Sequence, residues 1–195
     1  MDFLSSVRKD ENFQKLNFDY YDEGKFNEMV KNVSKLIDIS IFHLNIRSLN
    51  SHSRGLCQYL SLLSLCFDVI ILSEIWSNNI EFYYNILPGC TFYYDVPSYT
   101  NVGGVGIYVK DKFTVKEQQG YKIYSNDKVK VENIWLEVSQ SDSKYIIGGI
   151  YRHPNSSILD FYSATDPVLC KISSQNILCF IAVDINIDLI KCRTN

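Results

Sequence analysis

The chain has 195 residues, of which 46% are hydrophobic and 21% are charged, and its formal net charge is −3. A chain of this length and composition is expected to form one globular domain around a single core. No stretch approaches the roughly 20 consecutive apolar residues that span a bilayer, so no membrane partner is expected. The acidic balance argues against a protein that holds nucleic acid by bulk electrostatic attraction, but not against an enzyme that contacts a few phosphates briefly.

The N-terminus and the cysteines indicate an intracellular protein. The first residues, MDFLSSVRKDENFQK, contain no apolar core flanked by basic residues and so do not resemble a secretory signal. The six cysteines are scattered without a C-x-x-C pair, which favours reduced core thiols over disulfides or a zinc site. We therefore expect the protein in the nucleus or cytoplasm and not outside the cell.

The chain is expected to begin with an extension over residues 1–38, followed by the domain proper over residues 39–195. Residues 25–37, KFNEMVKNVSKLI, space their apolar side chains with the period of a helix. One amphipathic helix is therefore predicted in the extension.

A strand, a helix and a second strand are predicted next. Residues 39–45 alternate in polarity and begin with β-branched side chains, which predicts a strand that ends near Asn45. Residues 51–67 place apolar side chains on one helical face, with Ser51 or Ser53 as the N-cap. Residues 68–76, DVIILSEIW, are a short apolar run typical of a strand buried on both faces.

The rest of the chain mixes hairpins with one further helical segment. Several β-rich runs separated by turn clusters, between residues 90 and 154, predict antiparallel hairpins. Residues 156–176 have helical spacing, but Pro167 predicts a restart or kink there instead of one straight helix. Residues 177–190 predict the last strand. This order of elements fits an α+β two-layer or sandwich fold better than a doubly wound one.

Polar side chains follow four of the predicted strands at their C-terminal ends. They are Asn45, Glu74, Tyr151 with Arg152, and Asp184 with Asn186. Loops at strand ends are where a rigid scaffold presents functional groups, and carboxylates and amides suit a hard cation such as Mg²⁺. Each residue, read singly, also has a plain structural role as a strand-end charge, a turn cap or a core tyrosine. A plain structural role is hardest to assign to Asp184, because a carboxylate directly after the apolar run CFIAV is energetically costly if it is buried without a partner.

The sequence resembles the endonuclease/exonuclease/phosphatase superfamily in a series of blocks: HLNIRSLN, DVIILSEIW, GGVGIYVKD, NIWLEV, IIGGIYRHPN and FIAVDINIDLI. More narrowly, it looks like the apurinic-type endonuclease of non-LTR retrotransposons, whose blocks commonly read N-x-R-S-L, S-E-T-W, G-G-V-A-I-Y, Y-R-P-P and G-D-F-N. The resemblance covers residues 39–192. It implies an α+β protein built as a four-layered α/β sandwich, with two mixed β-sheets flanked by helices.

The resemblance also implies phosphodiester hydrolysis that depends on Mg²⁺, with Mn²⁺ as an alternative ion. Glu74 would bind the metal, and Asn45 would lie beside it as a ligand or catalytic residue. Asp184 would orient or deprotonate the attacking water. A phosphodiester is negatively charged, so its hydrolysis needs a cation for the developing charge and an aligned base for water.

The phosphate contacts are implied in the same way. Tyr151 would contact the scissile phosphate, and Asn186 would hydrogen-bond to it as charge builds up. Asp184 and Asn186 face one side because strand side chains alternate. Arg152 and Asn155, in the same block as Tyr151, would contact phosphate or DNA.

The implied role is the nicking of target DNA through transient contacts, which exposes a 3′ hydroxyl that primes reverse transcription. The reverse transcriptase domain of an intact parent polyprotein is the implied partner. Two alternatives stay open. One is another phosphoesterase on the same scaffold, such as an inositol-polyphosphate phosphatase, a sphingomyelinase or a deadenylase. The other is an inactive remnant of a retrotransposon.

Four positions depart from the family pattern, and the mildest is Ile185, which replaces a phenylalanine with another apolar side chain. Val183 stands where glycine is usual, and a β-branched side chain there needs room. Ile75 replaces a threonine and so removes a hydroxyl next to Glu74. His153 stands where proline is usual, and we expect it near the site without a catalytic task.

The largest departure concerns the C-terminus. Family members continue through two further strands to a Ser-Asp-His segment whose histidine contacts the phosphate, whereas this sequence stops at Asn195. We therefore expect a C-terminally truncated domain with its last strands missing. The sequence leaves open whether it is an active enzyme.

Overall fold

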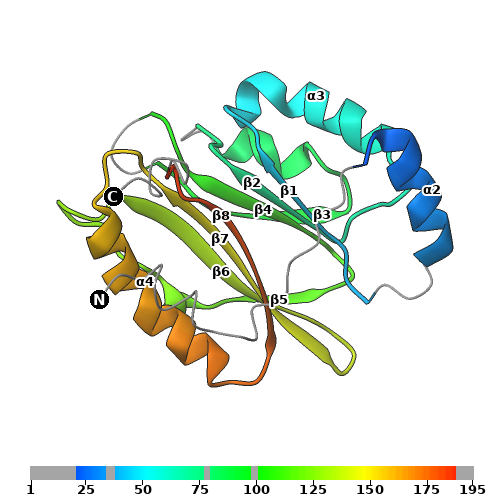
Figure 1. Cartoon of the computed structure of the whole chain (residues 1–195). Coiled ribbons are helices and arrows are strands. Elements are labelled where there is room, and N and C mark those ends of the chain that lie inside the picture. The colour runs from blue at the N-terminus through cyan, green and yellow to red at the C-terminus, as the bar shows by residue number, and fades with distance from the viewer. Residues whose placement is uncertain (1–20, 34–37, 77–79, 98–100, 188–195) are drawn as a thin grey trace.

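The computed structural model describes residues 21–33, 38–76, 80–97 and 101–187. They form four layers (Figure 1): two helices, a first β-sheet, a second β-sheet and a third helix. The predicted four-layered α/β sandwich of two mixed sheets is confirmed.

The first sheet, sheet A, contains two parallel strands joined through a helix. Its four strands lie in the order β1 (Ile41–Asn45), β2 (Val69–Ser73), β4 (Val105–Lys110), β3 (Cys90–Asp95). β1 and β2 are parallel and the other pairs are antiparallel. Parallel neighbours need a crossover connection, and α3 (Leu49–Leu62) supplies it. All five residues of β2 are buried, as its unbroken apolar run predicts.

The N-cap of α3 lies three residues earlier than predicted. The Ser48 side chain, and not that of Ser51 or Ser53, caps the helix, because its Oγ accepts a hydrogen bond from the Ser51 N–H at 3.3 Å. An N-cap needs a non-helical backbone as well as an oxygen. Ser48 has that backbone, at φ 87°, whereas Ser51 and Ser53 already lie inside the helix.

The second sheet, sheet B, has the strand order β5 (Thr114–Glu117), β6 (Val131–Gln140), β7 (Ser143–Arg152), β8 (Leu178–Asp184). β6 and β7 form the long antiparallel hairpin expected for this part of the chain. β7 and β8 are parallel, joined through α4 (Ile158–Ser173). Two short 3₁₀ helices complete the described elements, η2 (Glu81–Asn85) and η3 (Gln119–Tyr121).

α4 continues through Pro167, so the predicted restart there is wrong. Proline removes one helical N–H, but burial of Phe161, Thr165 and Ile172 holds the helix against sheet B on both sides of the proline. The last strand is also shorter than its apolar run, because β8 ends at Asp184.

Three apolar clusters separate the four layers. The central cluster lies between the two sheets and includes Ile71, Ile107, Leu136 and Ile147. A second cluster packs sheet A against α3 and α2 (Glu23–Val33), and a third packs sheet B against α4. Alternate residues of β7 enter the central and the third cluster, as the two-residue period of a strand requires.

Gly148 illustrates how closely β7 packs. A Cβ added at Gly148 would lie 2.5 Å from the six-membered ring of Trp135, a side chain that is 2% exposed. Only a residue without a side chain fits opposite this ring.

Asp68, just before β2, fastens the end of sheet A opposite the strand ends that carry Asn45 and Glu74. It accepts hydrogen bonds from the N–H and hydroxyl of Ser40, and forms ion pairs with Lys110 at 3.2 Å and Lys112 at 2.8 Å. Burial alone would raise the pKa of Asp68, but the contacts with Lys112, Ser40 and Lys110 outweigh it and hold the pKa below its usual value.

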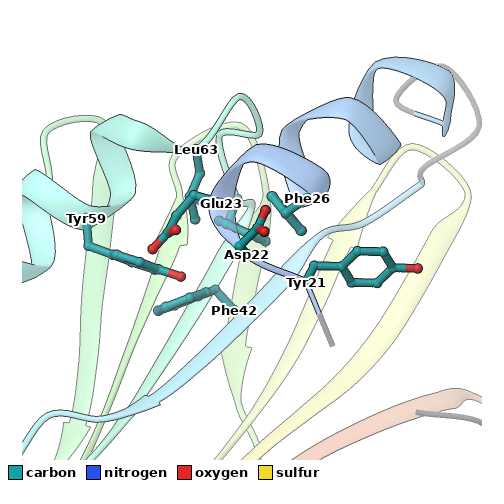
Figure 2. Close-up of a pocket in the computed structure, with 8 residues that line it drawn as sticks. Tyr21, Asp22, Glu23, Phe26, Phe42, Tyr59 and Leu63 are labelled. Carbon is teal, nitrogen blue, oxygen red and sulfur yellow. The ribbon is translucent and has the colours of Figure 1, made fainter. Parts of the chain in front are cut away.

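The helix predicted in the extension is α2, and it covers the outer face of sheet A. Its Phe26 ring stacks on that of Phe67 at 6.1 Å. A cleft of about 150 Å³ lies between α2, α3 and β1 (Figure 2), lined by Tyr21, Asp22, Glu23, Phe26, Phe42, Tyr59, Leu63 and Phe67. The domain boundary predicted near residue 38 stays a prediction.

Two other expectations concern the surface. Cys66 and Cys170 are exposed and are not core thiols, contrary to expectation. Within the described residues, no helix is both long and apolar enough to cross a membrane.

Candidate active site

The C-terminal ends of four strands meet at one edge of the sandwich. Asn45 ends β1 and Glu74 directly follows β2, while Tyr151 in β7 is level with Asp184 at the end of β8. Both strand pairs are parallel, so their C-terminal ends come together. Each sheet therefore supplies two of the predicted site residues.

Asn45 joins the two carboxylates. Its Nδ2 donates to Glu74 Oε1 at 3.0 Å and to Asp184 Oδ2 at 2.7 Å, and its Oδ1 accepts from the Arg47 N–H at 3.2 Å. One amide group thus bridges sheet A and sheet B. The structure brings Asn45, Glu74 and Asp184 together, as the sequence predicts. Their roles in binding a metal and activating water stay predictions.

The backbone around Glu74 is strained and held on several sides. Glu74 and Trp76 have φ angles of 58° and 55°, in the left-handed region that costs a non-glycine residue about 1–3 kcal/mol. The Glu74 carbonyl accepts from the Ser48 N–H at 2.8 Å, and the Trp76 N–H donates to the Gly103 carbonyl at 3.0 Å. The Trp76 indole donates to Glu74 Oε2 at 3.1 Å. Both carboxylate oxygens of Glu74 are therefore held in place.

Two departures from the family pattern are accommodated. Ile75, in place of threonine, is fully buried in the cluster between sheet A and the helices. Val183, in place of glycine, is 38% exposed, so its branched side chain has room.

Tyr151 presents a protonated hydroxyl to the site. Burial raises its pKa to about 12, and the negative charges of Glu74 and Asp184 add to the increase, whereas a hydrogen bond with Asn186 opposes it. The phenol therefore stays neutral at pH 7 and can donate to a negatively charged oxygen.

Arg152 clamps the turn after β8. It is 1% exposed, and its guanidinium donates to the carbonyls of Ile185 at 2.6 Å, Asn186 at 2.9 Å and Ser156. In return, the Asn186 Nδ2 donates a hydrogen bond to the Arg152 carbonyl at 2.8 Å. Every described bond of the guanidinium goes to the protein backbone, so the predicted phosphate contact of Arg152 stays a prediction. So does that of Asn155, which is exposed in the loop after β7.

His43 lies beneath the site. Burial lowers its pKa, while the charge of Asp184 acts in the opposite direction. Its Nε2 is 3.4 Å from the Ser73 hydroxyl.

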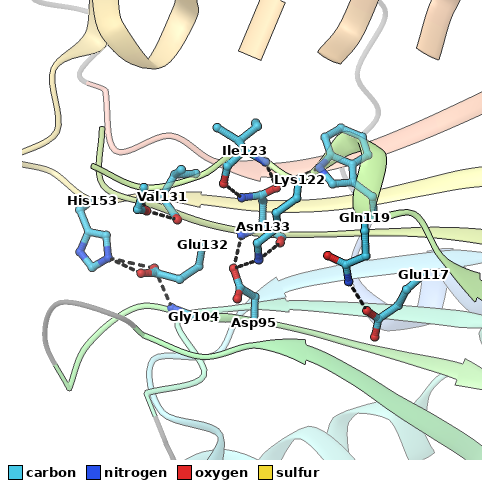
Figure 3. A network of polar contacts seen from close by, with 12 residues as sticks. Asp95, Gly104, Glu117, Gln119, Lys122, Ile123, Val131, Glu132, Asn133 and His153 are labelled. Atoms are coloured by element: carbon cyan, nitrogen blue, oxygen red, sulfur yellow. Dashed lines mark hydrogen bonds and ion pairs between the residues drawn. The ribbon is translucent and has the colours of Figure 1, made fainter. Parts of the chain in front are cut away.

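Sequence reasoning missed the buried pair of Glu132 and His153, which Figure 3 shows, and the ring of His153 lies against that of Tyr151. His153 Nε2 lies 2.9 Å from both carboxylate oxygens of Glu132, and the two residues are 6% and 1% exposed. A glutamate at the start of the apolar run VENIWLEV is the only signal that could have pointed to it, because its partner comes from another strand end.

The donor set at the strand ends fits a hard divalent cation. Glu74 and Asp184 offer carboxylate oxygens, which are the type of ligand that Mg²⁺ prefers, whereas the Asn45 amide oxygen accepts from the Arg47 N–H. The NH₂ group of Asn45 lies between the carboxylates, where positive charge is favoured. Within the described ranges, no group of three or more His, Cys, Asp or Glu side chains could hold a metal, so Glu74 and Asp184 are the two carboxylates that this edge offers to such an ion.

Solved structures share this fold. A scan of protein-family models and a search of curated proteins find no match. Among solved structures, D. rerio TDP2 complexed with a single-strand DNA product aligns with TM-score 0.56 and 20% identity, over 80% of this chain and 63% of that one. The endonuclease domain of TRAS1, a telomere-specific non-LTR retrotransposon, aligns with TM-score 0.56 and 9% identity, over 78% and 61%.

A Bacteroides thetaiotaomicron mannosyl-6-phosphatase aligns with TM-score 0.57 and 16% identity, over 78% of this chain and 67% of that one. The chain spans less than two thirds of the length of the TDP2 and TRAS1 structures. All three are endonuclease/exonuclease/phosphatase-superfamily folds. The chain therefore has the endonuclease/exonuclease/phosphatase fold that its sequence blocks implied.

Proposed function

We propose that this chain is a divalent-metal-dependent phosphodiesterase that nicks DNA, in the manner of a non-LTR retrotransposon endonuclease. The observation that supports this most is the meeting of Glu74, Asp184 and Asn45 at one point where two sheets end. Such an arrangement of oxygen donors beside a buried tyrosine suits the hydrolysis of a phosphate ester.

The metal would be held by Glu74 with Asn45 beside it, and when bound it would neutralise charge on the phosphate. Mg²⁺ is the ion we propose, with Mn²⁺ as a substitute. Asp184, half-buried at the end of β8, would orient the attacking water and accept its proton.

The phosphate itself would be held by neutral donors. The Tyr151 hydroxyl is protonated at neutral pH because burial raises its pKa to about 12. The Asn186 amide donates to the Arg152 carbonyl and also forms a hydrogen bond with the Tyr151 hydroxyl, so Asn186 and Tyr151 would face the phosphate together. Donors held rigidly before the reaction lower the energy of the charged transition state.

DNA is the proposed substrate because two proteins of the same fold act on it or bind it. The TRAS1 domain is a retrotransposon endonuclease, and the TDP2 structure contains a single-strand DNA product. The net charge of −3 is consistent with few and transient phosphate contacts. The partner in an intact parent would be a reverse transcriptase domain.

The test is the conversion of supercoiled plasmid to nicked circles with Mg²⁺, with Mn²⁺ and with EDTA. Glu74→Gln and Asp184→Asn should each lower the rate about a hundredfold or more, since each removes a group that acts in the transition state. Asp142→Asn, at an exposed carboxylate in the β6–β7 turn, is the matched control and should leave the rate unchanged.

Two other outcomes are informative. The mannosyl-6-phosphatase of the same fold makes a phosphomonoesterase the second candidate. Faster turnover of mannose 6-phosphate than of plasmid, again lost in Glu74→Gln, would favour that candidate over DNA nicking. Folded protein that cleaves neither substrate would favour the inactive remnant.

A further inference from the structure

We propose that the buried Glu132–His153 pair is a positioning device that fixes Glu74 and Tyr151 across the two sheets. The proposal deepens the proposed function and rests on it for its consequence in metal binding. Glu132 acts through the Gly104 N–H and His153 acts through the ring of Tyr151, so both are positioning residues.

The pair is closed off from water and firmly held. His153 Nε2 is 2.9 Å from each oxygen of Glu132, and the side chains are 8% and 1% exposed. The backbone adds to this, because Glu132 is level with Tyr151 in the β6–β7 hairpin and the His153 N–H donates to the Lys130 carbonyl at 3.0 Å. Removing one member would leave a buried polar partner unsatisfied, which is strongly unfavourable.

The Glu132–His153 pair of sheet B is connected to sheet A through the turn that contains Gly103 and Gly104 (Figure 3). Glu132 Oε2 accepts a hydrogen bond from the Gly104 N–H at 3.2 Å. The neighbouring Gly103 carbonyl accepts from the Trp76 N–H at 3.0 Å, and the Trp76 indole donates to Glu74 Oε2 at 3.1 Å. A continuous path of hydrogen bonds and covalent bonds therefore leads from the buried pair to the predicted metal ligand.

The same turn is wedged against Tyr151. A Cβ added at Gly103 would lie 2.9 Å from Glu132 Oε2, 3.0 Å from Tyr151 Cε1 and 3.1 Å from His153 Cε1. The His153 ring also meets the Tyr151 ring nearly edge to face, at 5.0 Å between centroids and 81° between planes. With Gly103 at φ 114°, the turn fits only a glycine, and the pair, the turn and the tyrosine form one close-packed unit.

A second polar bridge between the sheets provides the matched control. Asp95 of sheet A accepts from the Asn133 N–H of sheet B at 2.7 Å and pairs with Lys122 at 2.6 Å. Figure 3 shows it beside Glu132. It has no described hydrogen bond to Trp76 or Glu74, so Asp95→Asn should weaken the sandwich without loosening the site.

The experiment compares Glu132→Ala, Glu132→Gln and His153→Gln with Asp95→Asn, each well below its melting temperature. The first readout is acrylamide quenching of tryptophan fluorescence in metal-free protein. Of the two tryptophans, Trp135 is 2% exposed and Trp76 is partly exposed, so quenching reports on Trp76. Glu132→Ala should raise the quenching constant at least about twofold, as local opening exposes the ring.

The second readout is Mn²⁺ affinity, measured by titration with electron paramagnetic resonance. Glu132→Ala should weaken it roughly tenfold, as losses of outer-shell partners commonly do. Glu132→Gln and His153→Gln keep a hydrogen-bonding group, so their quenching constants and Mn²⁺ affinities should lie between those of Glu132→Ala and wild type. Asp95→Asn should lower the melting temperature and leave quenching and affinity at the wild-type values.

The proposal fails if Glu132→Ala lowers only the melting temperature, as expected of Asp95→Asn. If Glu132→Ala does not fold, the two glutamine variants decide by the same readouts, and wild-type quenching in both would overturn the proposal. If the wild type neither binds Mn²⁺ nor nicks DNA, the proposed function fails, whereas the quenching result in metal-free protein still decides whether the pair positions Trp76.

Discussion

Replacing Arg152 with lysine tests whether this residue is a structural clamp. Its guanidinium donates to three backbone carbonyls, those of Ile185, Asn186 and Ser156. A lysine keeps the positive charge but can reach only about one of them, because an ammonium group lacks the planar fork of a guanidinium. Two hydrogen bonds from a charged donor are therefore lost.

The size of the effect follows from this count. Hydrogen bonds that involve a charged group contribute about 1.5–3 kcal/mol each, and some of the loss is offset by water entering at the turn. We expect Arg152→Lys to lower the free energy of unfolding by about 3 kcal/mol. For a chain of this length, that corresponds to a melting temperature roughly 6–12 °C lower.

Urea unfolding, followed by the fluorescence of the buried Trp135, measures the change. Arg54→Lys, at an exposed arginine of α3, is the matched control and should stay within about 0.5 kcal/mol of wild type. An Arg152→Lys protein as stable as that control would refute the clamp. If that protein also bound DNA more weakly than the control, the residue would instead be the phosphate contact that the sequence suggests, because lysine cannot reproduce the two-pronged contact of a guanidinium with a phosphate.

Two further predictions concern packing and pH. Gly148→Ala should lower the free energy of unfolding by about 1–3 kcal/mol, because the added methyl group meets the Trp135 ring. Gly55→Ala has open space around the added methyl group in α3 and should raise the free energy of unfolding by about 0.5–1 kcal/mol. Equal effects of the two variants in urea unfolding would contradict this. Asp68→Asn should lower the melting temperature at pH 7. Since the folded state holds the pKa of Asp68 below its usual value, the stabilisation is complete above about pH 4 and fades as pH falls further. The wild-type and variant melting temperatures should converge as the pH falls below about 4, and a constant difference would contradict the pairing.

Local patterns predicted the elements of this fold because each element depends on nearby residues. The apolar run at residues 69–73 and the helical spacing before it correspond to β2 and to α3, the crossover helix between β1 and β2. The sequence resemblance then predicted the four-layered sandwich, and it chose Asn45, Glu74 and Asp184, which the structure brings together. Their grouping follows from parallel strands that end at one edge.

What the sequence did not predict depends on contacts between distant residues. Arg152 looks like a solvent-facing cation beside Tyr151 until the turn after β8 supplies its carbonyl partners, which lie 33 and 34 positions away. Glu132 looks like the exposed residue of an alternating strand, and only its pairing with His153, 21 positions on, explains its burial. The α3 cap was misplaced for a local reason, because several serines compete there and only backbone angles distinguish them.

The hydrogen bond from Asn45 to Asp184 joins residues 139 positions apart, and it has a consequence for synthesis. A ribosome completes β1 long before β8, so a nascent chain with only sheet A has half of the strand-end residues and no Asp184. Folding that depends on such distant contacts is slow. Any ligand that binds both sheets would also add its binding free energy to their docking, about 2.7 kcal/mol at a concentration one hundred times its dissociation constant. The strand-end cluster of Asn45, Glu74 and Asp184 is thus complete only after translation has passed β8 and the two sheets have docked.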